Sequence, residues 1–244
     1  MFKKLNSFAK DVVYATRIGY IFYPFRHFLV FLSNVSEISV WIHKNKKGIE
    51  KNDFFRWKRN YHQRLDGFEF ILKKYDVENV PVSYMEFGVA SGDSFSWWLN
   101  RLKNKESSFW GFDTFEGLPE DWGLFFKKGA MAHHISKFDD ARYIFVKGIF
   151  QDTLVKFIKE NQEVILLSRR KIIHLDADLF SATVFVLSQL YPYLNNGDIL
   201  IFDEFSVPNS EFYALKIFQD CFYIKLKPVC ATNNFYQTIF EVEK

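Results

Sequence analysis

The chain has 244 residues, of which 48% are hydrophobic, and a formal net charge of +3. This composition excludes a disordered or collagen-like chain and is typical of one globular domain with a short appendage. The two cysteines, Cys221 and Cys230, form no CxxC or Cys/His cluster. We therefore expect neither structural zinc nor a secreted disulfide framework, and we expect a reduced, cytoplasmic protein.

The charge is unevenly distributed along the chain. Residues 1–60 carry about 12 Lys and Arg against about 4 Asp and Glu, which leaves about +8 there and about −5 in the remainder. A basic N-terminal region predicts contact with an anionic partner, such as a membrane surface or a polyanion. A solvated helical face is the alternative interpretation.

The N-terminal region is also rich in aromatic residues. Pro24, Arg26 and His27 interrupt its apolar run at 18–32, so the uninterrupted pieces are shorter than the roughly 18–20 residues of a membrane-spanning helix. No small-x-small cleavage site follows the run. Two interpretations stay open: an interfacial segment that lies on a membrane, which would make the protein peripheral there, and a cap helix packed over the core. Aromatic and basic residues alternate at 54–62, but no nucleic-acid module surrounds them, so we set nucleic acid aside as a partner.

From residue 65 onward, helical and strand patterns alternate. Helices are predicted at 65–75, 93–102, 152–160, 182–194 and 210–220, and strands at 82–87, 108–113, 142–147, 171–175 and 199–202. Two final strands, at 222–227 and 235–242, leave no room for a helix and predict an antiparallel hairpin. The fold class is therefore α/β: a doubly wound, mostly parallel, seven-stranded Rossmann-like sheet with a C-terminal antiparallel hairpin. Residues 1–76 are expected to form an N-terminal helical extension or cap, and residues 77–244 the main domain.

The strand–turn–helix unit at 83–102 carries the clearest functional signal. Its two glycines, Gly88 and Gly92, allow a ligand to approach the backbone, and the helix start offers free N–H groups. Their spacing departs from the dinucleotide G-x-G-x-x-G pattern, and no G-K-[ST] follows that would indicate a P-loop. Glu86 stands where a dinucleotide site usually has an apolar residue, and its carboxylate suits a cationic sulfonium such as that of S-adenosylmethionine. Asp113 ends the next strand, where an acid typically binds ribose hydroxyls.

Acidic residues gather at the predicted carboxyl ends of strands, which is the edge where open α/β sheets bind ligands. They are Glu86, Asp113, Asp176, Asp178, Asp203 and Glu204. Six carboxylates on one edge would repel one another unless a sulfonium, a divalent metal or bound protons lay among them. Asp176 with Asp203 and Glu204 could form an oxygen-ligand site, which favours Mg²⁺ or Ca²⁺ over zinc. Capping of the following helix is the alternative role for Asp178 or Glu204.

An irregular stretch at 114–141 separates the second strand from the third. A loop of that length in a compact domain is usually functional. It contains His133 and His134, which we treat as secondary candidates for substrate contact.

Five sequence blocks occur in an order that resembles macrocin O-methyltransferase-like enzymes. They are E-F-G-V-A-S-G at 86–92, G-F-D-T-F-E-G-L-P at 111–119, G-I-F-Q-D-T-L at 148–154, H-L-D-A-D-L-F-S-A-T at 174–183 and D-E at 203–204. Enzymes of that family are class I S-adenosylmethionine-dependent methyltransferases, several of them metal-dependent, that act on sugar hydroxyls. The resemblance covers about residues 82–240, and residues 1–60 resemble no family that we can name.

The resemblance implies a role for each matching residue. Glu86, Gly88 and Gly92 would shape the methionine end of the donor pocket, Asp113 would bind the ribose, and residues 148–151 would lie near the adenine. The full implied donor set is Glu86, Gly88, Ala90, Ser91, Gly92, Asp113, Thr114, Phe115, Gly148, Phe150, Gln151 and Asp176. The implied metal ligands are Asp176, Asp203 and Glu204, and Asp178 is the implied base. The family's metal-binding enzymes usually have two aspartates where this chain has Asp203-Glu204, whose glutamate has the longer side chain.

The sequence thus predicts an S-adenosylmethionine-dependent O-methyltransferase that modifies a hydroxyl of a sugar, a glycosylated small molecule or a glycan with the help of Mg²⁺. One alternative is a non-catalytic Rossmann-like binding or scaffold protein at a membrane surface. The other is an RNA methyltransferase, although the chain lacks the Asn/Asp-Pro-Pro-Tyr motif of base N-methylation. The sequence specifies neither the acceptor nor the oligomeric state.

Overall fold

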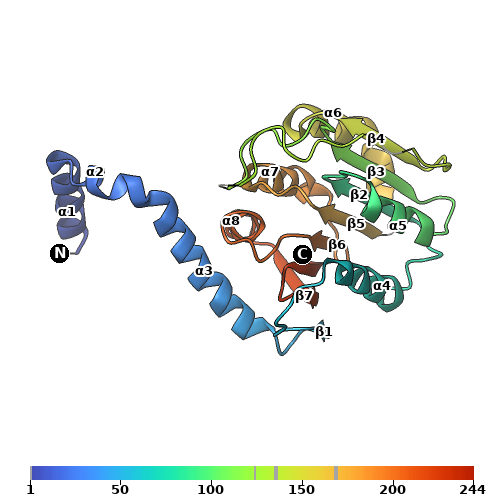
Figure 1. The fold of residues 1–244 in the computed structure, drawn as a ribbon, viewed down its shortest axis with the longest axis horizontal. Helices are drawn as coiled ribbons and strands as arrows, with labels where there is room; N and C mark the ends of the chain where they lie inside the picture. The colour runs from blue at the N-terminus through green and yellow to red at the C-terminus, as the bar shows by residue number, and fades with distance from the viewer. Residues whose placement is uncertain (1, 124, 135–136, 168–169) are drawn as a thin grey trace.

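The computed structural model describes residues 2–123, 125–134, 137–167 and 170–244. Its centre is an eight-stranded sheet with the order β1-β7-β8-β6-β5-β2-β3-β4 (Figure 1). The strands are β1 Lys51–Asn52, β2 Val82–Phe87, β3 Ser108–Asp113, β4 Tyr143–Lys147, β5 Arg170–Leu175, β6 Ile199–Phe202, β7 Lys225–Thr232 and β8 Gln237–Glu243.

The order of the strands confirms the doubly wound sheet. The five strands from β4 to β6 pair in parallel, and β8 runs antiparallel to both of its neighbours, β6 and β7. The chain moves outward from β2 to β3 and β4 and then returns to β5 on the other side of β2. The crevice between β2 and β5 is therefore the topological switch point, where such sheets bind ligands. The seven predicted strands are present, and the short eighth strand β1, which pairs in parallel with β7, was not predicted.

Helices cover both faces of the sheet. They are α4 Arg64–Lys74, α5 Asp93–Arg101, α6 Phe150–Leu167, α7 Phe180–Leu190 and α8 Glu211–Phe222. Alternate side chains of a strand point to opposite faces, so Tyr84 packs in the core cluster with α4 and α5, whereas Met85 and Phe87 pack with α6, α7 and α8. These two apolar layers fix the sheet between the helices and leave its carboxyl edge free for a site.

Several element boundaries differ from the prediction. Helix α6 begins at Phe150 and extends to Leu167, beyond the predicted 152–160. Helix α7 ends at Leu190, where a 3₁₀ turn, Tyr191–Tyr193, replaces the last predicted turn and accommodates a proline. Strand β7 begins at Lys225 because Phe222 still belongs to α8, which Tyr223 ends in the left-handed conformation.

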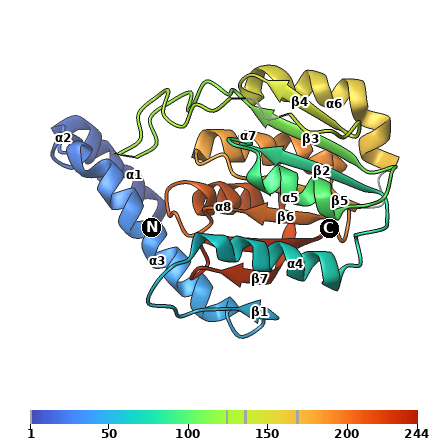
Figure 2. The same ribbon diagram turned by 45° about the vertical axis from the view of Figure 1, so that its right-hand side comes forward.

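The N-terminal region is helical, as predicted. It consists of α1 Phe2–Thr16, α2 Gly19–Phe22, a 3₁₀ turn Tyr23–Phe25 and α3 Arg26–Asn45. In both ribbon views these helices stand away from the sheet, on the opposite side from β4 (Figures 1 and 2). The first buried side chains are Asn34 and Ile38, in the second half of α3, which packs near α8. Every side chain at 5–33 is exposed, whereas the second half of α3 packs near the domain, so the choice between an extension and a cap stays a prediction. Among the described residues, no helix is long and apolar enough to cross a membrane.

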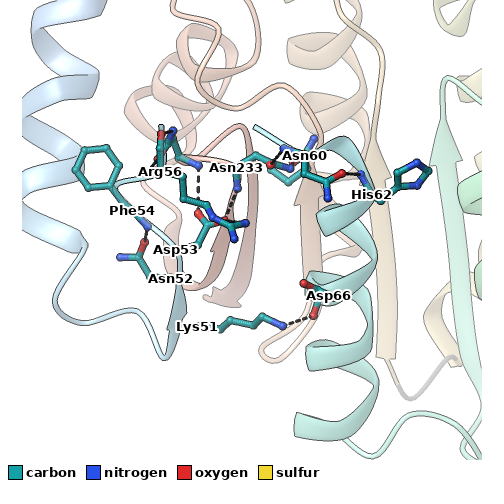
Figure 3. A network of polar contacts seen from close by, with 11 residues as sticks. Lys51, Asn52, Asp53, Phe54, Arg56, Asn60, His62, Asp66 and Asn233 are labelled. Carbon is teal, nitrogen blue, oxygen red and sulfur yellow. Dashed lines mark hydrogen bonds and ion pairs between the residues drawn. The ribbon is translucent and has the colours of Figure 1, made fainter. Parts of the chain in front are cut away.

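The segment between α3 and α4 is tied to the turn between β7 and β8 (Figure 3). Asp53 accepts hydrogen bonds from the backbone N–H groups of Asn233 (3.0 Å) and Asn234 (3.2 Å). In return, the backbone N–H of Asn60 donates to the side chain of Asn233 at 2.9 Å. These bonds attach residues 46–63 to the sheet and bring the start of α4 to its carboxyl edge, and the predicted division between residues 1–76 and 77–244 stays a prediction.

Candidate active site

The turn after β2 is built around Gly88. Its φ of +95° lies in the region that favours glycine. A Cβ atom at this position would lie 1.9 Å from the backbone oxygen of Asp176. The backbone N–H of Asp176 donates to the oxygen of Phe87 at 2.9 Å, which holds the ends of β2 and β5 together. The close approach of these two strand ends requires glycine at position 88.

Asp113 joins the same turn to the end of β3. One carboxylate oxygen accepts from the backbone N–H groups of Val89 and Ala90, both at 2.8 Å, and the other accepts from Phe115 at 2.7 Å. An ionised carboxylate offers about four lone-pair positions, so about one remains for a ligand. The predicted ribose-binding acid is thus also a structural link between two loops.

A cavity of about 420 Å³ lies at the carboxyl ends of the strands. Nine of the predicted residues line it: Gly88, Ala90, Asp113, Thr114, Phe150, Gln151, Asp176, Asp178 and Glu204. The long loop after β3 adds an apolar wall of Leu118, Trp122, Phe126 and Met131. The long loop therefore contributes to the site, as predicted for a loop of this length.

Other predicted residues are not among those that line the cavity. They are Glu86, Ser91, Gly92, Phe115, Gly148 and Asp203, together with the exposed histidines His133 and His134. The carboxylate of Glu86 is buried, accepts a hydrogen bond from the hydroxyl of Tyr84, and lies 3.8 Å from Nδ1 of His174. Glu86 therefore belongs to a polar cluster behind the cavity wall, and its contact with the donor stays a prediction.

The strand-end acids do converge, and a further acid joins them. Glu211 at the start of α8 is fully buried and accepts a hydrogen bond from the backbone N–H of Glu204 at 2.9 Å. Burial, and then the charge of Asp176, raises the pKa values of Glu204 and Glu211 well above their usual range. Burial and the charge of Asp203 do the same to the pKa of Asp176. The carboxyls of the cluster are therefore easier to protonate than exposed ones, so bound protons stay one of the three ways of relieving the repulsion, beside a sulfonium and a divalent metal.

Asp178 occupies a distinct position in this cluster. Its backbone has a left-handed φ of +59°, and its carbonyl oxygen accepts a hydrogen bond from the hydroxyl of Ser210. The pKa of its carboxyl is raised to about 7, chiefly by burial. A hydrogen bond with Glu204 lowers the pKa, and the negative charges of Asp203 and Asp113 raise it further. A pKa near the working pH suits a general base.

Two cations balance the acids. Burial alone would lower the pKa of His174, but its interactions with Asp203 and Glu86 outweigh burial and raise the pKa to about 10. Its Nε2 atom lies 3.8 Å from Asp203, which is longer than a hydrogen bond, so this attraction is electrostatic. Arg64, from α4, lies 3.7 Å from the other oxygen of Asp203. Burial would raise the pKa of Asp203, but the two cations and Tyr61 together lower it.

Tyr61 is a site residue that the sequence analysis missed. Its hydroxyl donates to Asp203 at 2.5 Å and lies 3.4 Å from Glu204. Burial, followed by the charges of Asp203 and Glu204, raises the pKa of this hydroxyl far above its usual value, so it remains a neutral donor. Tyr236, in the turn before β8, approaches Glu204 from the same side at 3.5 Å. The aromatic and basic pattern at 54–62 was visible in the sequence, but it gave no sign that Tyr61 and Arg64 meet the acids.

Some of the acids lie close enough together to hold a metal ion. Among the described residues, two sets could offer converging ligand atoms: His174, Asp176 and Asp203, or Asp176, Asp178 and Glu204. One oxygen each of Asp203 and Glu204 is buried without a hydrogen-bond partner. The all-oxygen set fits Mg²⁺. Neither set contains all three predicted ligands, because Asp203 belongs to the first set and Glu204 to the second, so the ligand assignment stays a prediction.

Comparisons with known proteins agree with this geometry. A model of the macrocin-O-methyltransferase (TylF) family matches residues 130–230. A curated relative from Streptomyces olivaceus, 8-demethyl-8-(2,3-dimethoxy-alpha-L-rhamnosyl)-tetracenomycin-C 4'-O-methyltransferase, is 25% identical over 166 residues, which are 59% of this chain and 61% of the relative. The match thus spans about three fifths of the relative's length.

Solved structures share the fold. The calicheamicin methyltransferase CalS11 superposes with a TM-score of 0.58 and 22% identity over 75% of this chain and 80% of its own. The O-methyltransferase NovP superposes with a TM-score of 0.59 and 19% identity over the same shares of the two chains. The fold is that of the class I S-adenosylmethionine-dependent methyltransferases. The family model over residues 130–230 and the curated relative confirm the resemblance to the macrocin O-methyltransferase family that the sequence predicted.

Proposed function

We propose that the protein is a cytoplasmic, S-adenosylmethionine-dependent O-methyltransferase that methylates a hydroxyl of a sugar, a glycosylated small molecule or a glycan. The observation that carries the proposal is the cavity at the β2–β5 switch point, where the Gly88 turn, Asp113 and the strand-end acids meet. The curated relative, a 4'-O-methyltransferase of a rhamnosyl-tetracenomycin, supports a sugar acceptor.

The residues at the cavity have separate roles in this proposal. The Gly88 turn and Asp113 hold the donor, and the acid cluster suits its sulfonium charge. Methyl transfer is an in-line displacement in which the acceptor oxygen bonds to the methyl carbon as the carbon–sulfur bond breaks, so positioning supplies much of the rate. The proton of the acceptor hydroxyl passes to Asp178, whose pKa of about 7 allows it to act as the base.

We propose Mg²⁺ as a helper of this reaction. Asp176 with Glu204 and either Asp178 or Asp203 would hold it, and when bound it would lower the pKa of the acceptor hydroxyl. If Asp178 is a ligand, it cannot also serve freely as the base, so the two roles compete. Calorimetric titration of Mg²⁺ into the protein in the presence of S-adenosylhomocysteine, compared for Asp178→Asn and Asp203→Asn, decides between the two ligand sets.

Donor binding is the experiment that tests the proposal. Calorimetry should detect S-adenosylmethionine at micromolar affinity and no binding of NAD. Asp113→Ala should weaken donor binding by roughly 1–3 kcal/mol, the scale of lost hydrogen bonds to a charged group. Asp121→Ala, which removes an exposed acid paired with Lys127, is the matched control and should leave the affinity unchanged. Tight NAD binding, or equal affinity of Asp113→Ala and the wild type, would contradict the donor assignment.

A screen of acceptors, with sugar nucleotides and glycans first, follows with and without Mg²⁺. Donor binding without turnover of any acceptor would instead favour the non-catalytic scaffold. Strongly salt-dependent RNA binding would favour the RNA methyltransferase. The anionic membrane surface predicted as a partner of residues 1–60 concerns a different surface of the chain and is a separate proposal.

A further inference from the structure

Residues 2–33 form an arm in which no side chain with a described exposure is buried against the rest of the chain. Every side chain at 5–33 is exposed, as is Phe2 at 89%. We call residues 2–33 the N-terminal arm; it contains α1, α2, the 3₁₀ turn and the first half of α3 (Figures 1 and 2). A continuous exposed apolar surface on a folded protein usually marks a site that binds a partner protein or a membrane.

Helix α1 is amphipathic. Phe2, Leu5, Phe8, Val12 and Val13 recur at helical spacing and form one apolar stripe, and each is exposed. Lys10 and Asp11 fall on the opposite side of the helical repeat. A helix of this type suits the plane of an interface, with one face in an apolar medium and the other in water.

The middle of the arm is apolar on all sides. The aromatic run at 20–25 is followed by five consecutive apolar residues at 28–32, and a run of five places side chains all around a helix of 3.6 residues per turn. Tyr20 is 77% exposed and Ile21 is 63% exposed. A groove on a folded protein covers one face of a helix and would leave the other side chains in water. Lipid can surround such a segment, and tyrosines are typical of its polar boundary.

The charges of the arm indicate which apolar partner fits. Its sequence contains Lys3, Lys4, Lys10, Arg17 and Arg26 against the single acid Asp11. Two such arms packed against each other would bring like net charges together. Anionic lipid headgroups would instead attract the arm while the apolar side chains enter the boundary of the bilayer. Because no described helix is long and apolar enough to span, the contact is with one surface of the membrane.

We propose that the N-terminal arm binds an anionic lipid surface, with α1 lying in the interface and the apolar runs at 20–25 and 28–32 inserted at shallow depth, while Arg26 between them meets the headgroups. The cavity at the sheet edge takes no part in this contact, so the proposal does not rest on the methyltransferase assignment. The arm attaches to the domain through the second half of α3 and Lys216, which pairs with Glu37 at 2.6 Å.

Vesicle flotation of the full chain tests this inference. Vesicles of phosphatidylcholine with about one third phosphatidylglycerol should carry the protein, and vesicles of phosphatidylcholine alone should carry much less. Lys10→Gln with Arg17→Gln should lower the partition coefficient about fivefold for each charge removed, which corresponds to about 1 kcal/mol per basic residue. Higher salt should also release the protein from the anionic vesicles.

The apolar part of the contact has its own variant and control. Ile21→Glu with Leu29→Glu should abolish flotation. Val155→Glu, at an exposed apolar residue on α6, should float like the wild type. Binding to neither vesicle, or equally to both, would overturn the proposal. Failure to float together with a stable dimer that Ile21→Glu and Leu29→Glu disperse would assign the arm to a second copy of the chain, which also overturns it.

Discussion

Replacing Gly88 with alanine would place a methyl group where the chain has no room for it. The new carbon would lie 1.9 Å from the backbone oxygen of Asp176 and 2.7 Å from its carbonyl carbon. These are backbone atoms, and the neighbouring N–H of Asp176 is bonded to Phe87, so the strand end cannot move without breaking that bond. The substitution must therefore separate the ends of β2 and β5 at the cavity.

The magnitude follows from three contributions. A left-handed φ costs an alanine about 1–2 kcal/mol. The loss of a backbone hydrogen bond adds roughly 1 kcal/mol, and the steric overlap adds roughly 1–3 kcal/mol. Gly88→Ala should therefore lower the free energy of unfolding by roughly 3–6 kcal/mol, which is large for a single substitution. Gly129 provides the matched control, because its φ of +83° is similar and no atom lies within 4 Å of its added Cβ. Gly129→Ala should cost only the first contribution.

Thermal unfolding and calorimetry measure the two effects together. For a chain of this size, 1 kcal/mol corresponds to roughly 2–4 °C in Tm, so Gly88→Ala should melt well below Gly129→Ala. Its donor Kd should rise at least tenfold, which equals about 1.4 kcal/mol, whereas Gly129→Ala should bind the donor normally. Equal stability and equal donor affinity of the two variants would refute the argument that the approach of β2 to β5 builds the site.

Two further predictions concern the acid cluster. Tyr61→Phe removes the hydroxyl that donates to Asp203, and it should lower the free energy of unfolding by roughly 1.5–3 kcal/mol, the value of a hydrogen bond to a charged group. Tyr223→Phe, at an exposed tyrosine, is the control and should change the stability little. Equal melting temperatures of the two variants would show that the Tyr61 contact is weak. Because Asp178 acts as a base only when it is deprotonated, kcat should fall about tenfold for each pH unit below its pKa of about 7 and should level off above it. Bound Mg²⁺ would move this fall of kcat to lower pH. Asp178→Asn should lower kcat by roughly 10²–10⁴ and abolish its dependence on pH in this range. If kcat of Asp178→Asn still fell below pH 7, the titrating group would be another residue.

The sequence alone determined most of the fold. Alternating apolar strands and amphipathic helices predicted the parallel sheet, and the two final strands without an intervening helix predicted the hairpin of β7 and β8. These predictions succeed because hydrophobic periodicity and turn residues are local properties. The Gly88 turn and the acids at strand ends were visible for the same reason, since the topology of a parallel sheet places its carboxyl ends on one edge.

The tertiary structure decided how those residues meet. Strand β1, which pairs with β7, has only two residues, and a pattern that short cannot indicate a strand. The hydrogen bonds between Asp53 and the turn at Asn233 bring Tyr61 and Arg64 to Asp203. Glu86 has the right sequence position for a donor contact, but Tyr84 and His174 hold it behind the cavity. Contacts between residues far apart in the chain depend on packing, which no local pattern encodes.

The sequence by itself determined the class of fold, the glycine turn after β2 and the edge of the sheet where the acids gather, because each follows from local periodicity and from the geometry of parallel strands. Only the tertiary structure decided the partners of each acid, since burial and neighbouring charges set the pKa values of Asp178 and His174. It also decided that the N-terminal helices leave the domain, because an apolar helix can cover its own core or another surface, and its sequence is similar in both cases.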